Sequence, residues 1–236
     1  MLENAFATPA AKRRYVRRLF ATIAPRYDLI TRLLSFGLDQ RWKRRLIALA
    51  GIRRDATVLD LACGTGDLAI AAAEGGADVI GLDITPGMLT LARGRGVEAG
   101  RGIRYAAADM SALPLPPAIV DVITTGYGLR NVPDLPRALA EAFRVLRPGG
   151  RLCALDFDRP ENRAVREVYL AYLTVVGSTL GLLLHRDPDT YRYIPASIRR
   201  YPGARGVVSL MQDAGFRDVR HVRVLGGLMA IHIATR

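Results

Sequence analysis

The sequence predicts an α/β fold in which a mainly parallel, seven-stranded sheet carries helices on both faces and follows an N-terminal helical extension. Two observations lead to this expectation. From Thr57 onward, apolar strand-like segments alternate with amphipathic helical segments, and repeated strand–helix units form parallel sheets covered by helices. At the end of the chain, two strand-like segments follow each other closely, which is typical of an antiparallel pair.

Each expected strand is a short apolar segment bounded by turn residues. Five strands are expected at residues 57–62, 78–84, 103–109, 120–127 and 151–157, and the terminal pair at 219–225 and 227–235. Helices are expected at residues 67–74, 86–93, 135–146 and 207–214. The segment Arg147-Pro148-Gly149-Gly150 is typical of a helix stop followed by a turn.

The N-terminal segment differs in charge from the rest of the chain. Residues 1–54 contain thirteen Lys or Arg against three acids, whereas residues 55–150 contain eight against eleven. Apolar residues recur at helical spacing between residues 12 and 50, which predicts one or two basic amphipathic helices. We therefore expect a basic helical extension at 1–54 and one α/β domain at 55–236, with an apolar helical insertion near 163–200.

Several classes of protein do not fit this composition. Cys63 and Cys153 are too few for a disulfide framework and fit a reducing cytoplasm. The start of the chain lacks the apolar core of a secretory signal. The apolar run Val168–Leu184 is shorter than the roughly 20 residues of a spanning helix. A buried helix, or a lid over an apolar site, is therefore preferred to a membrane span.

The sharpest local motif is VLDLACGTGD, at residues 58–67. A strand there ends in a glycine-rich turn that opens a helix, so Gly64 and Gly66 permit close approach of a ligand to the backbone. Residues 64–69 also fit the G-x-G-x-x-A form of the dinucleotide fingerprint. Asp83, at the end of the second strand, would bind a ribose in either case. The motif alone thus leaves a nicotinamide enzyme and a methyl-transfer enzyme open.

Charge favours the second alternative. S-adenosylmethionine is cationic and has no pyrophosphate, and Asp60 and Asp67 near the loop suit a cation better than a dinucleotide. Asp109, after the third strand, would reach the adenine amino group, and its alternative role is to cap the turn at Met110-Ser111. The three histidines are interpreted as structural, and no spacing of Cys, His and acidic residues indicates a metal site.

Four segments together resemble the ubiquinone/menaquinone biosynthesis C-methyltransferase family of class I, Rossmann-like methyltransferases. They are VRRLFATIAPRYDLITRLLSFGLDQRW, VLDLACGTGDLA, YGLRNVPDLPRALAEAFRVLRPGGRLCALDF and YRYIPASIRRYPGARGVVSLMQDAGF. The second is common to a large superfamily, whereas GLRNV with RVLRPGG is much more specific. The chain departs from the family pattern at Ile30-Thr31, Asp39, Cys63, Gly126 and Asp156-Phe157-Asp158. Several departures fall where an acceptor ring would be held.

The resemblance implies an S-adenosylmethionine-dependent C-methyltransferase that acts on a prenylated quinol in menaquinone or ubiquinone biosynthesis. It implies donor binding by Asp60, Gly64, Thr65, Gly66, Asp83, Ile84, Ala108, Asp109 and Gly126. Arg130 and Asn131 match its GLRN segment, so we expect Arg130 to stabilise the phenolate of the ring and Asn131 to orient it. The alternative for Arg130 is a structural pair with Asp134 or Asp156.

The same resemblance suggests where a prenyl tail would bind. The apolar run and the N-terminal helices would hold the tail, and the basic extension would bind the anionic surface of a membrane. We expect a cytoplasmic enzyme, peripheral at the inner face of the membrane, with no nucleic acid partner. The oligomeric state stays open, with a homodimer as one alternative.

Three other functions are compatible with parts of the sequence. A methyltransferase of soluble phenols or other natural products would share the scaffold and would explain the departures. An RNA methyltransferase would use the basic extension, but the chain has no aromatic–basic RNA module and its middle is acidic. A non-catalytic binding protein is disfavoured because Asp60, Gly64, Gly66 and Asp83 are all present.

Overall fold

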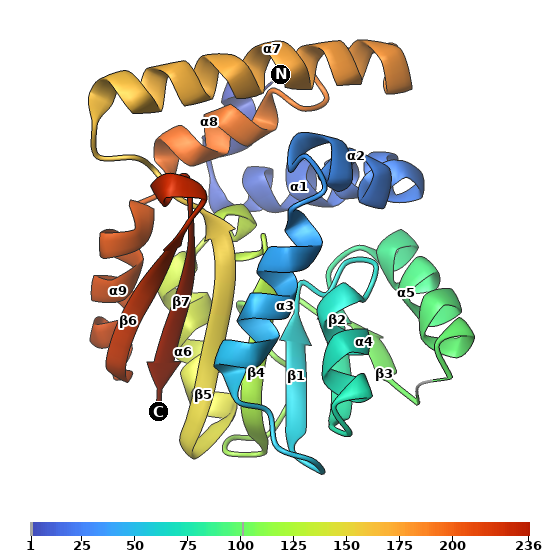
Figure 1. Ribbon diagram of the computed structural model, residues 1–236, viewed down its shortest axis with the longest axis vertical. Coiled ribbons are helices and arrows are strands. Elements are labelled where there is room, and N and C mark those ends of the chain that lie inside the picture. Colours follow the sequence, from blue (N-terminus) through green and yellow to red (C-terminus); the bar gives the residue numbers. More distant parts are fainter. Residues whose placement is uncertain (1, 101) are drawn as a thin grey trace.

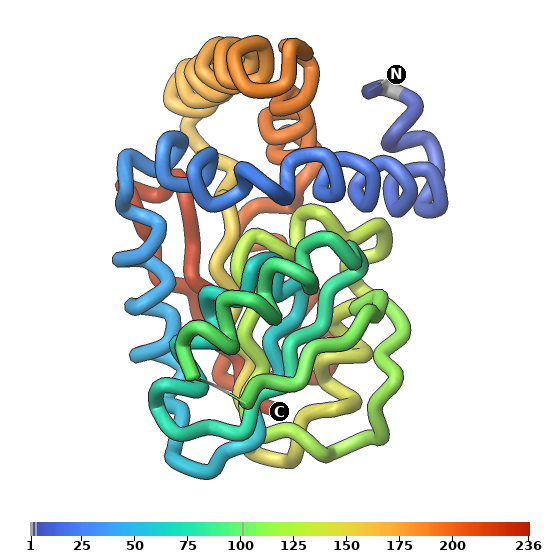
Figure 2. Tube along the Cα trace, turned by 90° about the vertical axis from the view of Figure 1, so that its right-hand side faces the viewer, coloured from blue at the N-terminus to red at the C-terminus, as the bar shows by residue number. Residues whose placement is uncertain are grey.

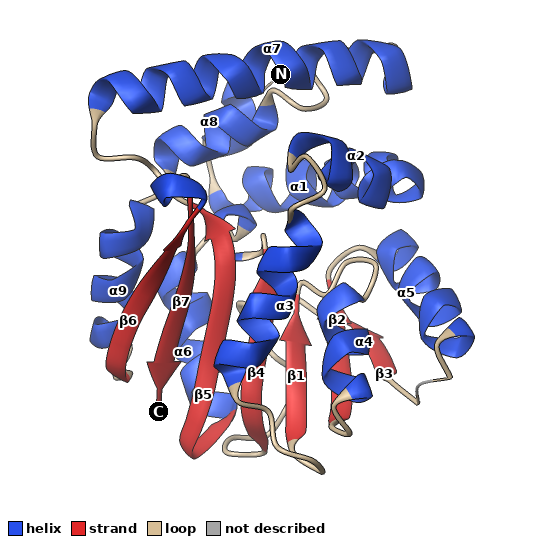
Figure 3. Cartoon of the chain, viewed as in Figure 1, coloured by secondary structure: helices blue, strands red, loops and turns tan. Residues whose placement is uncertain are grey.

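The computed structural model describes residues 2–100 and 102–236, which form a seven-stranded sheet of order β3-β2-β1-β4-β5-β7-β6 (Figures 1 and 3). Neighbouring strands from β3 to β5 pair in parallel, and β7 pairs antiparallel with both β5 and β6. The bounds are β1 Thr57–Leu61, β2 Asp78–Asp83, β3 Arg104–Ala107, β4 Val120–Gly126, β5 Leu146–Phe157, β6 Arg217–Val224 and β7 Met229–Thr235. The predicted sheet and its terminal antiparallel pair are confirmed.

Helices pack on both faces of the sheet and bury two apolar cores. On one face lie α3 (Asp39–Ala50) and α4 (Asp67–Glu74), whose buried side chains meet Val58 and Leu155 of the sheet. On the other lie α6 (Leu135–Val145) and α9 (Gly203–Asp213), which cover Leu59. Residues of α5 (Pro86–Glu98) contact β2 and β3. Burial of both faces explains why the parallel strands read as continuous apolar runs.

Four further helices lie across the carboxyl ends of the parallel strands, and we call them the roof (Figures 1 and 2). They are α1 (Pro9–Ile23), α2 (Tyr27–Leu34), α7 (Arg163–His185) and α8 (Tyr193–Arg200). In both views α7 forms the outer edge of the molecule, and α1 lies between it and the sheet. The roof therefore joins the N-terminal extension to the insertion after β5, at the edge of the sheet where ligands of open α/β folds bind.

Local sequence accounts for the two long roof helices. The Thr8 hydroxyl accepts a hydrogen bond from Ala11 N at 3.1 Å, and Pro9 occupies the first turn of α1. Asn162 caps α7 in the same way, through Val165 N at 3.1 Å. The helix ends at His185, and the next residue, Arg186, has a left-handed φ of 56°. Local residues thus define both ends of α7.

Three sequence expectations need correction. The extension folds as three α-helices and not as one or two, because a 3-10 turn at Ala24–Arg26, which contains Pro25, separates α1 from α2. Residues 147–150 do not close α6 with a turn: they lie within β5 as an irregular bulge. The pairing of Val120 with Leu146 is followed directly by that of Val122 with Arg151. Four residues of β5 thus lie opposite one residue of β4, and Gly149, whose φ is 77°, accommodates the three extra residues.

The helix that contains the apolar run is longer than the run itself, because residues 163–167, three of them charged, and His185 extend it to 23 residues. By length and composition alone, α7 could cross a membrane. These two properties are weak evidence for a membrane span, because α7 also packs on other helices of the protein. Its inner side contacts α8 and α2. Helix α8, which the sequence analysis did not predict, lies directly beneath α7 in Figure 1.

The close seating of α7 on the loop before α8 predicts opposite effects for two glycine substitutions. A Cβ at Gly181 would overlap the Asp187 carbonyl oxygen and lie 3.3 Å from Pro188 Cα, both backbone atoms that cannot rotate away. We expect Gly181→Ala to lower the free energy of unfolding by about 1–3 kcal/mol. Gly94, in α5, has open space around it. Gly94→Ala is therefore expected to raise stability by about 0.5–1 kcal/mol.

Urea denaturation of both variants and the native chain measures this difference. Equal effects of the two substitutions would show that α7 does not pack on residues 187–188 in solution.

Candidate functional site

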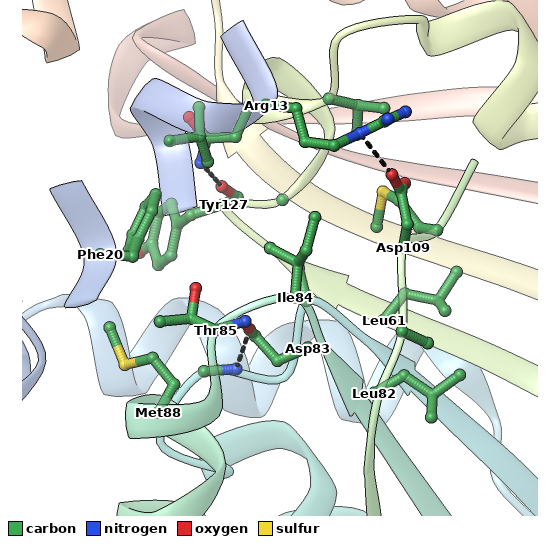
Figure 4. A pocket seen from close by; sticks show the side chains of 18 of the residues that line it. Arg13, Phe20, Leu61, Leu82, Asp83, Ile84, Thr85, Met88, Asp109 and Tyr127 are labelled. Atoms are coloured by element: carbon green, nitrogen blue, oxygen red, sulfur yellow. Dashed lines mark hydrogen bonds and ion pairs between the residues drawn. The ribbon is translucent and has the colours of Figure 1, made fainter. Parts of the chain in front are cut away.

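A narrow pocket lies at the carboxyl ends of β1, β2 and β4, and we call it the loop pocket (Figure 4). Its volume is about 80 Å³. The glycine loop after β1 and the ends of β2 and β4 form its floor, and α1 covers it from the roof side. Its polar lining includes Asp83, Thr85, Asp109 and Asn131, and its apolar lining includes Val16, Phe20, Ile84, Met88 and Tyr127.

The glycine loop adopts a conformation that other residues resist. Gly64 and Gly66 have φ values of 54° and 90°, in the left-handed region. A Cβ at Gly66 would lie 2.6 Å from the Tyr105 hydroxyl oxygen, so this position combines a conformational and a steric demand for glycine. Gly66 caps α4, which points the amino end of that helix toward the loop. The predicted strand–turn–helix unit is therefore present.

Asp83 holds the loop in place from the end of β2. Its Oδ2 accepts a hydrogen bond from Gly64 N at 2.9 Å, and its Oδ1 accepts one from Thr85 N at 2.7 Å. Burial raises the pKa of this carboxyl, and the hydrogen bonds from the two backbone amides oppose that rise. Asp83 also lines the loop pocket, so the strand-end position expected for a ribose-binding acid is occupied as the sequence indicated.

Asp109 both caps a turn and lines the loop pocket, although the sequence indicated these two roles as alternatives. Its Oδ1 accepts a hydrogen bond from Ser111 N at 2.8 Å, which is the predicted turn cap. Its Oδ2 lies 2.7 Å from Arg13 Nε, and Asp109 lines the loop pocket as well. Figure 4 shows Arg13 reaching down from α1 to this carboxylate across the pocket. Arg13 was not predicted, because no local pattern links it to a residue about a hundred positions away.

The expected donor-binding residues divide into two groups. Gly64, Asp83, Ile84, Ala108, Asp109 and Gly126 line the loop pocket, whereas Asp60, Thr65 and Gly66 do not. Thr65 turns away from the pocket and donates a hydrogen bond to Asp28 Oδ1 at 2.7 Å. Asp60 is 1% exposed and accepts a hydrogen bond from the Thr124 hydroxyl at 2.8 Å. Side chains alternate along β1, so Asp60 and its neighbour Leu61 point to opposite sides.

Asp60 still bears on the charge of the site. Burial raises its pKa to about 7, and its Oδ2 has no hydrogen-bond partner among the described residues. The carboxylates of Asp83 and Asp109 line the loop pocket, and the orphaned oxygen of Asp60 adds a third acid, buried on β1, an arrangement that fits a cationic ligand. The residues present therefore fit S-adenosylmethionine. Among the described residues, no group of three or more His, Cys, Asp or Glu is placed to hold a metal ion.

Asp67 has a different role from the one expected. Its carboxylate lies 2.6 Å from both Lys43 Nζ and Arg95 Nη2, and it accepts a hydrogen bond from Gln40 at 2.8 Å. Burial alone would raise its pKa, but Lys43 and Arg95 lower it to about 2. This carboxylate is thus neutralised by protein cations and does not line the loop pocket. It ties α3 and α5 to the first residue of α4.

A second, larger space lies between the roof and the strand ends, and we call it the roof cavity. Its volume is about 750 Å³, and its lining is almost wholly apolar or aromatic. The walls come from α1, α2, α7 and α8, together with Trp42, Phe157 and Met229 below. Three residues, Phe20, Tyr27 and Tyr127, line both the roof cavity and the loop pocket. The two spaces therefore adjoin at these aromatic side chains.

Arg130 and Asn131 stand at this junction, after the end of β4. Arg130 lines the roof cavity and Asn131 lines the loop pocket. Asn131 Oδ1 accepts a hydrogen bond from Arg130 Nη1 at 2.9 Å, and Asn131 Nδ2 donates to the Tyr127 carbonyl at 2.8 Å. These two neighbouring residues therefore also contact each other through their side chains, at the place where the roof cavity meets the loop pocket.

Asp156 holds Arg130 from below. Arg130 Nε lies 3.1 Å from Asp156 Oδ1, and both side chains are buried. Asp156 Oδ2 also accepts a hydrogen bond from Arg130 N at 3.0 Å. The structural pairing considered for Arg130 therefore involves Asp156, whereas Asp134 caps α6 through Arg137 N. The Arg130 guanidinium carbon lies 4.8 Å from the centroid of the Phe157 ring, and Arg130 lines the roof cavity. The side chain therefore pairs with Asp156 and lines the cavity at the same time.

Comparison with known proteins places this geometry in context. Residues 8–236 match the model of the ubiE/COQ5 methyltransferase family. The chain is 43% identical over 220 residues to the demethylmenaquinone methyltransferase of Thermus thermophilus, covering 92% of this chain and all of that one. It is 40% identical over 228 residues to a ubiquinone/menaquinone biosynthesis C-methyltransferase of Acidiphilium cryptum, covering 95% and 92%.

Solved structures agree on the fold. An S-adenosylmethionine-dependent methyltransferase of Thermotoga maritima, described as a possible histamine N-methyltransferase, aligns with a TM-score of 0.67. It is 19% identical and covers 93% of this chain and 99% of its own. A phosphoethanolamine N-methyltransferase of Haemonchus contortus, solved with S-adenosylmethionine, aligns with a TM-score of 0.62 at 13% identity, covering 83% and 52%. These likenesses concern the fold alone.

The neutralised state of Asp67 predicts a pH-dependent contribution to stability. An ordinary Asp has a pKa of about 3.9, so holding it at about 2 stabilises the folded chain by about 2.5 kcal/mol at pH 7. Because the folded-state pKa is lowered, this stabilisation is complete above pH 4 and is lost as the pH falls toward 2. We expect Asp67→Asn to lower the free energy of unfolding at pH 7 by about this amount.

Urea denaturation between pH 7 and pH 3 measures the effect, and the difference from the native chain should shrink below pH 4. The matched control is Asp78→Asn, which breaks the exposed pair with Arg104 and should change stability by less than about 1 kcal/mol. An Asp67→Asn effect as small as that of the control would contradict the ion network.

Proposed function

This chain belongs to the ubiE/COQ5 methyltransferase family, and from that premise we propose that it methylates a ring carbon of a prenylated quinol. It is an S-adenosylmethionine-dependent methyltransferase with the class I fold. The main support for a prenylated quinol as the acceptor is that the large apolar roof cavity adjoins the loop pocket at Phe20, Tyr27 and Tyr127. An acceptor held there would present its ring to the donor.

The dimensions and chemistry of the roof cavity suit such an acceptor. Its volume of about 750 Å³ lies within the range of about 300–1,000 Å³ of small-molecule sites. Ile23, Ile30 and Leu34 line it from the N-terminal helices, and Tyr169 and Leu173 line it from α7. An isoprenoid chain loses water contact along these walls, and each buried methylene contributes about 0.8 kcal/mol. A small soluble phenol would leave most of that surface unused.

The residues at the junction account for the chemistry that the ring needs. The bound donor supplies an electrophilic methyl group, which an electron-rich ring carbon attacks. A phenolate is more electron-rich at its ortho carbon than a neutral hydroxyl, so a positive group beside the ring oxygen favours the reaction. Arg130 is the cation in the cavity wall, and Asn131 and Asp156 fix its guanidinium. The reduced quinol is the competent acceptor, because a quinone ring is electron-poor.

Residues of the chain also exclude water and orient the two reactants. Phe20, Tyr27 and Tyr127 line the junction of the loop pocket and the roof cavity with aromatic surface. Asp83 and the glycine loop are fixed by backbone hydrogen bonds before any ligand arrives. Holding both partners in a rigid frame supplies most of what a direct displacement requires.

We further propose that the enzyme is cytoplasmic and works as a peripheral protein at an anionic membrane surface. The support is the basic extension, whose exposed arginines include Arg14, Arg17, Arg18 and Arg32 on α1 and α2. Such a cluster attracts anionic lipid at about 1 kcal/mol for each basic residue near the surface.

The proposed acceptor is tested by a mass-spectrometric methyl-transfer assay with S-adenosylmethionine. The acceptors are chemically reduced demethylmenaquinone, a reduced demethylated ubiquinone precursor and several soluble phenols. The expected result is C-methylation of one or both prenyl quinols, with little turnover of the phenols. Turnover of the phenols alone would assign the enzyme to natural-product metabolism and contradict the proposal.

The role of Arg130 predicts a selective loss of turnover. We expect Arg130→Ala to lower kcat by about 10²–10³ while the dissociation constant of S-adenosylmethionine is unchanged, because Arg130 lies on the acceptor side of the junction. Steady-state kinetics and calorimetric titration of the donor measure the two quantities.

A second variant separates catalysis from stability, because Arg130→Ala leaves Asp156 buried without its cation. Arg130→Lys keeps the charge but loses the planar fork that contacts Asn131 and Ser197. Full activity of both variants would show that Arg130 is only a structural partner of Asp156.

A further inference from the structure

The outward side of α7 carries a row of exposed apolar side chains. Val168, Val175, Leu182 and Leu183 are 72%, 66%, 56% and 73% exposed, and we call them the α7 stripe. Val168, Val175 and Leu182 are seven residues apart, which places them on one face of the helix over about 21 Å. No charged residue occurs between positions 168 and 184. Water-facing helix surfaces of this length ordinarily carry charges, so the stripe needs a partner.

The stripe adjoins the mouth of the roof cavity. Val165 and Val168 of α7 are exposed and also line the cavity. Phe36, after α2, is 75% exposed and stacks on Tyr172 of α7 at 6.2 Å, and it lines the cavity too. The cavity therefore opens at a rim of exposed apolar side chains that continues directly into the stripe. In Figures 1 and 2, α7 forms the outer edge of the molecule at this end.

Charge around the stripe indicates what covers it. Arg26 donates a hydrogen bond to the Leu184 carbonyl, which joins the basic α1–α2 segment to the end of α7. Two acids near the stripe are in ion pairs, Glu167 with Arg199 at 3.0 Å and Asp189 with Arg192 at 2.9 Å, and the carboxylate of Asp187 accepts hydrogen bonds from Asp189 N and the Thr190 hydroxyl. A second copy of the chain would bring the same basic segment against this one. An anionic surface with an apolar interior complements both the arginines and the stripe.

We propose that the α7 stripe is a membrane-docking surface that lies in the interface of an anionic bilayer. This inference rests on the proposed function, because it supplies the route of the prenyl tail. A helix lying in the interface buries its apolar face about 5–10 Å into the lipid. The rim at Phe36, Val165 and Val168 then meets the acyl region, and the tail enters the roof cavity without crossing water. α7 lies along the membrane and does not span it.

The experiment uses full-length protein with two charges placed on the stripe away from the cavity. Val175→Glu and Leu182→Glu, combined, change residues that do not line the roof cavity. The matched control is Val97→Glu on α5, which is 79% exposed and apolar but lies outside the roof. Circular dichroism and thermal unfolding first establish that the variants fold. Co-sedimentation then uses vesicles of phosphatidylcholine with and without phosphatidylglycerol.

We expect the native chain and Val97→Glu to bind the anionic vesicles equally. The double variant should bind them at least about tenfold more weakly, a loss of about 1.4 kcal/mol. Its turnover of a prenyl quinol embedded in vesicles should fall in parallel. Its turnover of a quinol with one isoprene unit, free in solution, should equal that of the native chain.

Each other outcome has a defined meaning. Equal vesicle binding by the double variant and the native chain would overturn the membrane-docking surface. Absence of vesicle binding by the native chain, with a dimer in light scattering that the double variant loses, would show that the stripe contacts a second copy. If the native chain methylates no quinol at all, the proposed function fails, while vesicle binding still decides the role of the stripe.

Discussion

The carboxylate of Asp67 forms ion pairs with Lys43 and Arg95, and these pairs hold the N-terminal helices against the glycine loop. Asp28 strengthens the same attachment by pairing with Arg95 and accepting a hydrogen bond from Thr65. Lys43 and Asp67 are each only 10% exposed at the side chain, so salt and water screen their contact weakly. Both candidate pockets need this attachment, since α1 covers the loop pocket and α1 and α2 wall the roof cavity.

The extension is therefore part of the site and not an appendage to a complete domain. The parallel sheet supplies the loop pocket floor through Asp83, Asp109 and the glycine loop. The roof supplies most of the wall of the roof cavity, where the proposed acceptor binds. This division fits the general rule that one fold supports many functions, because the sites added to it differ from protein to protein. It also explains why one buried pair, Arg130 with Asp156, stands where floor and roof meet. Isolated, either buried charge would be costly.

The sequence predicted the sheet well, because strand–helix alternation is a local signal and Asp83 and Asp109 follow directly from the ends of strands. Long-range contacts left no such signal. Nothing in the neighbourhood of Asp67 indicates Lys43 or Arg95, and nothing near Asp109 indicates Arg13. Alternation along β1 predicts that Asp60 and Leu61 point to opposite sides of the strand. Only the folded structure shows that Leu61, and not Asp60, faces the loop pocket. The bulge at residues 147–150 likewise depends on pairing with β4.

The most direct test of this account is a crystal structure with S-adenosylhomocysteine and a prenyl quinone analogue bound together. The account predicts the donor product in the loop pocket and the ring between Tyr27 and Tyr127, with a ring oxygen within hydrogen-bond distance of Arg130. It places the isoprenoid chain along Ile30 and Tyr169 toward Phe36. A ring bound outside the junction, or a roof cavity filled by rearranged protein side chains, would contradict it.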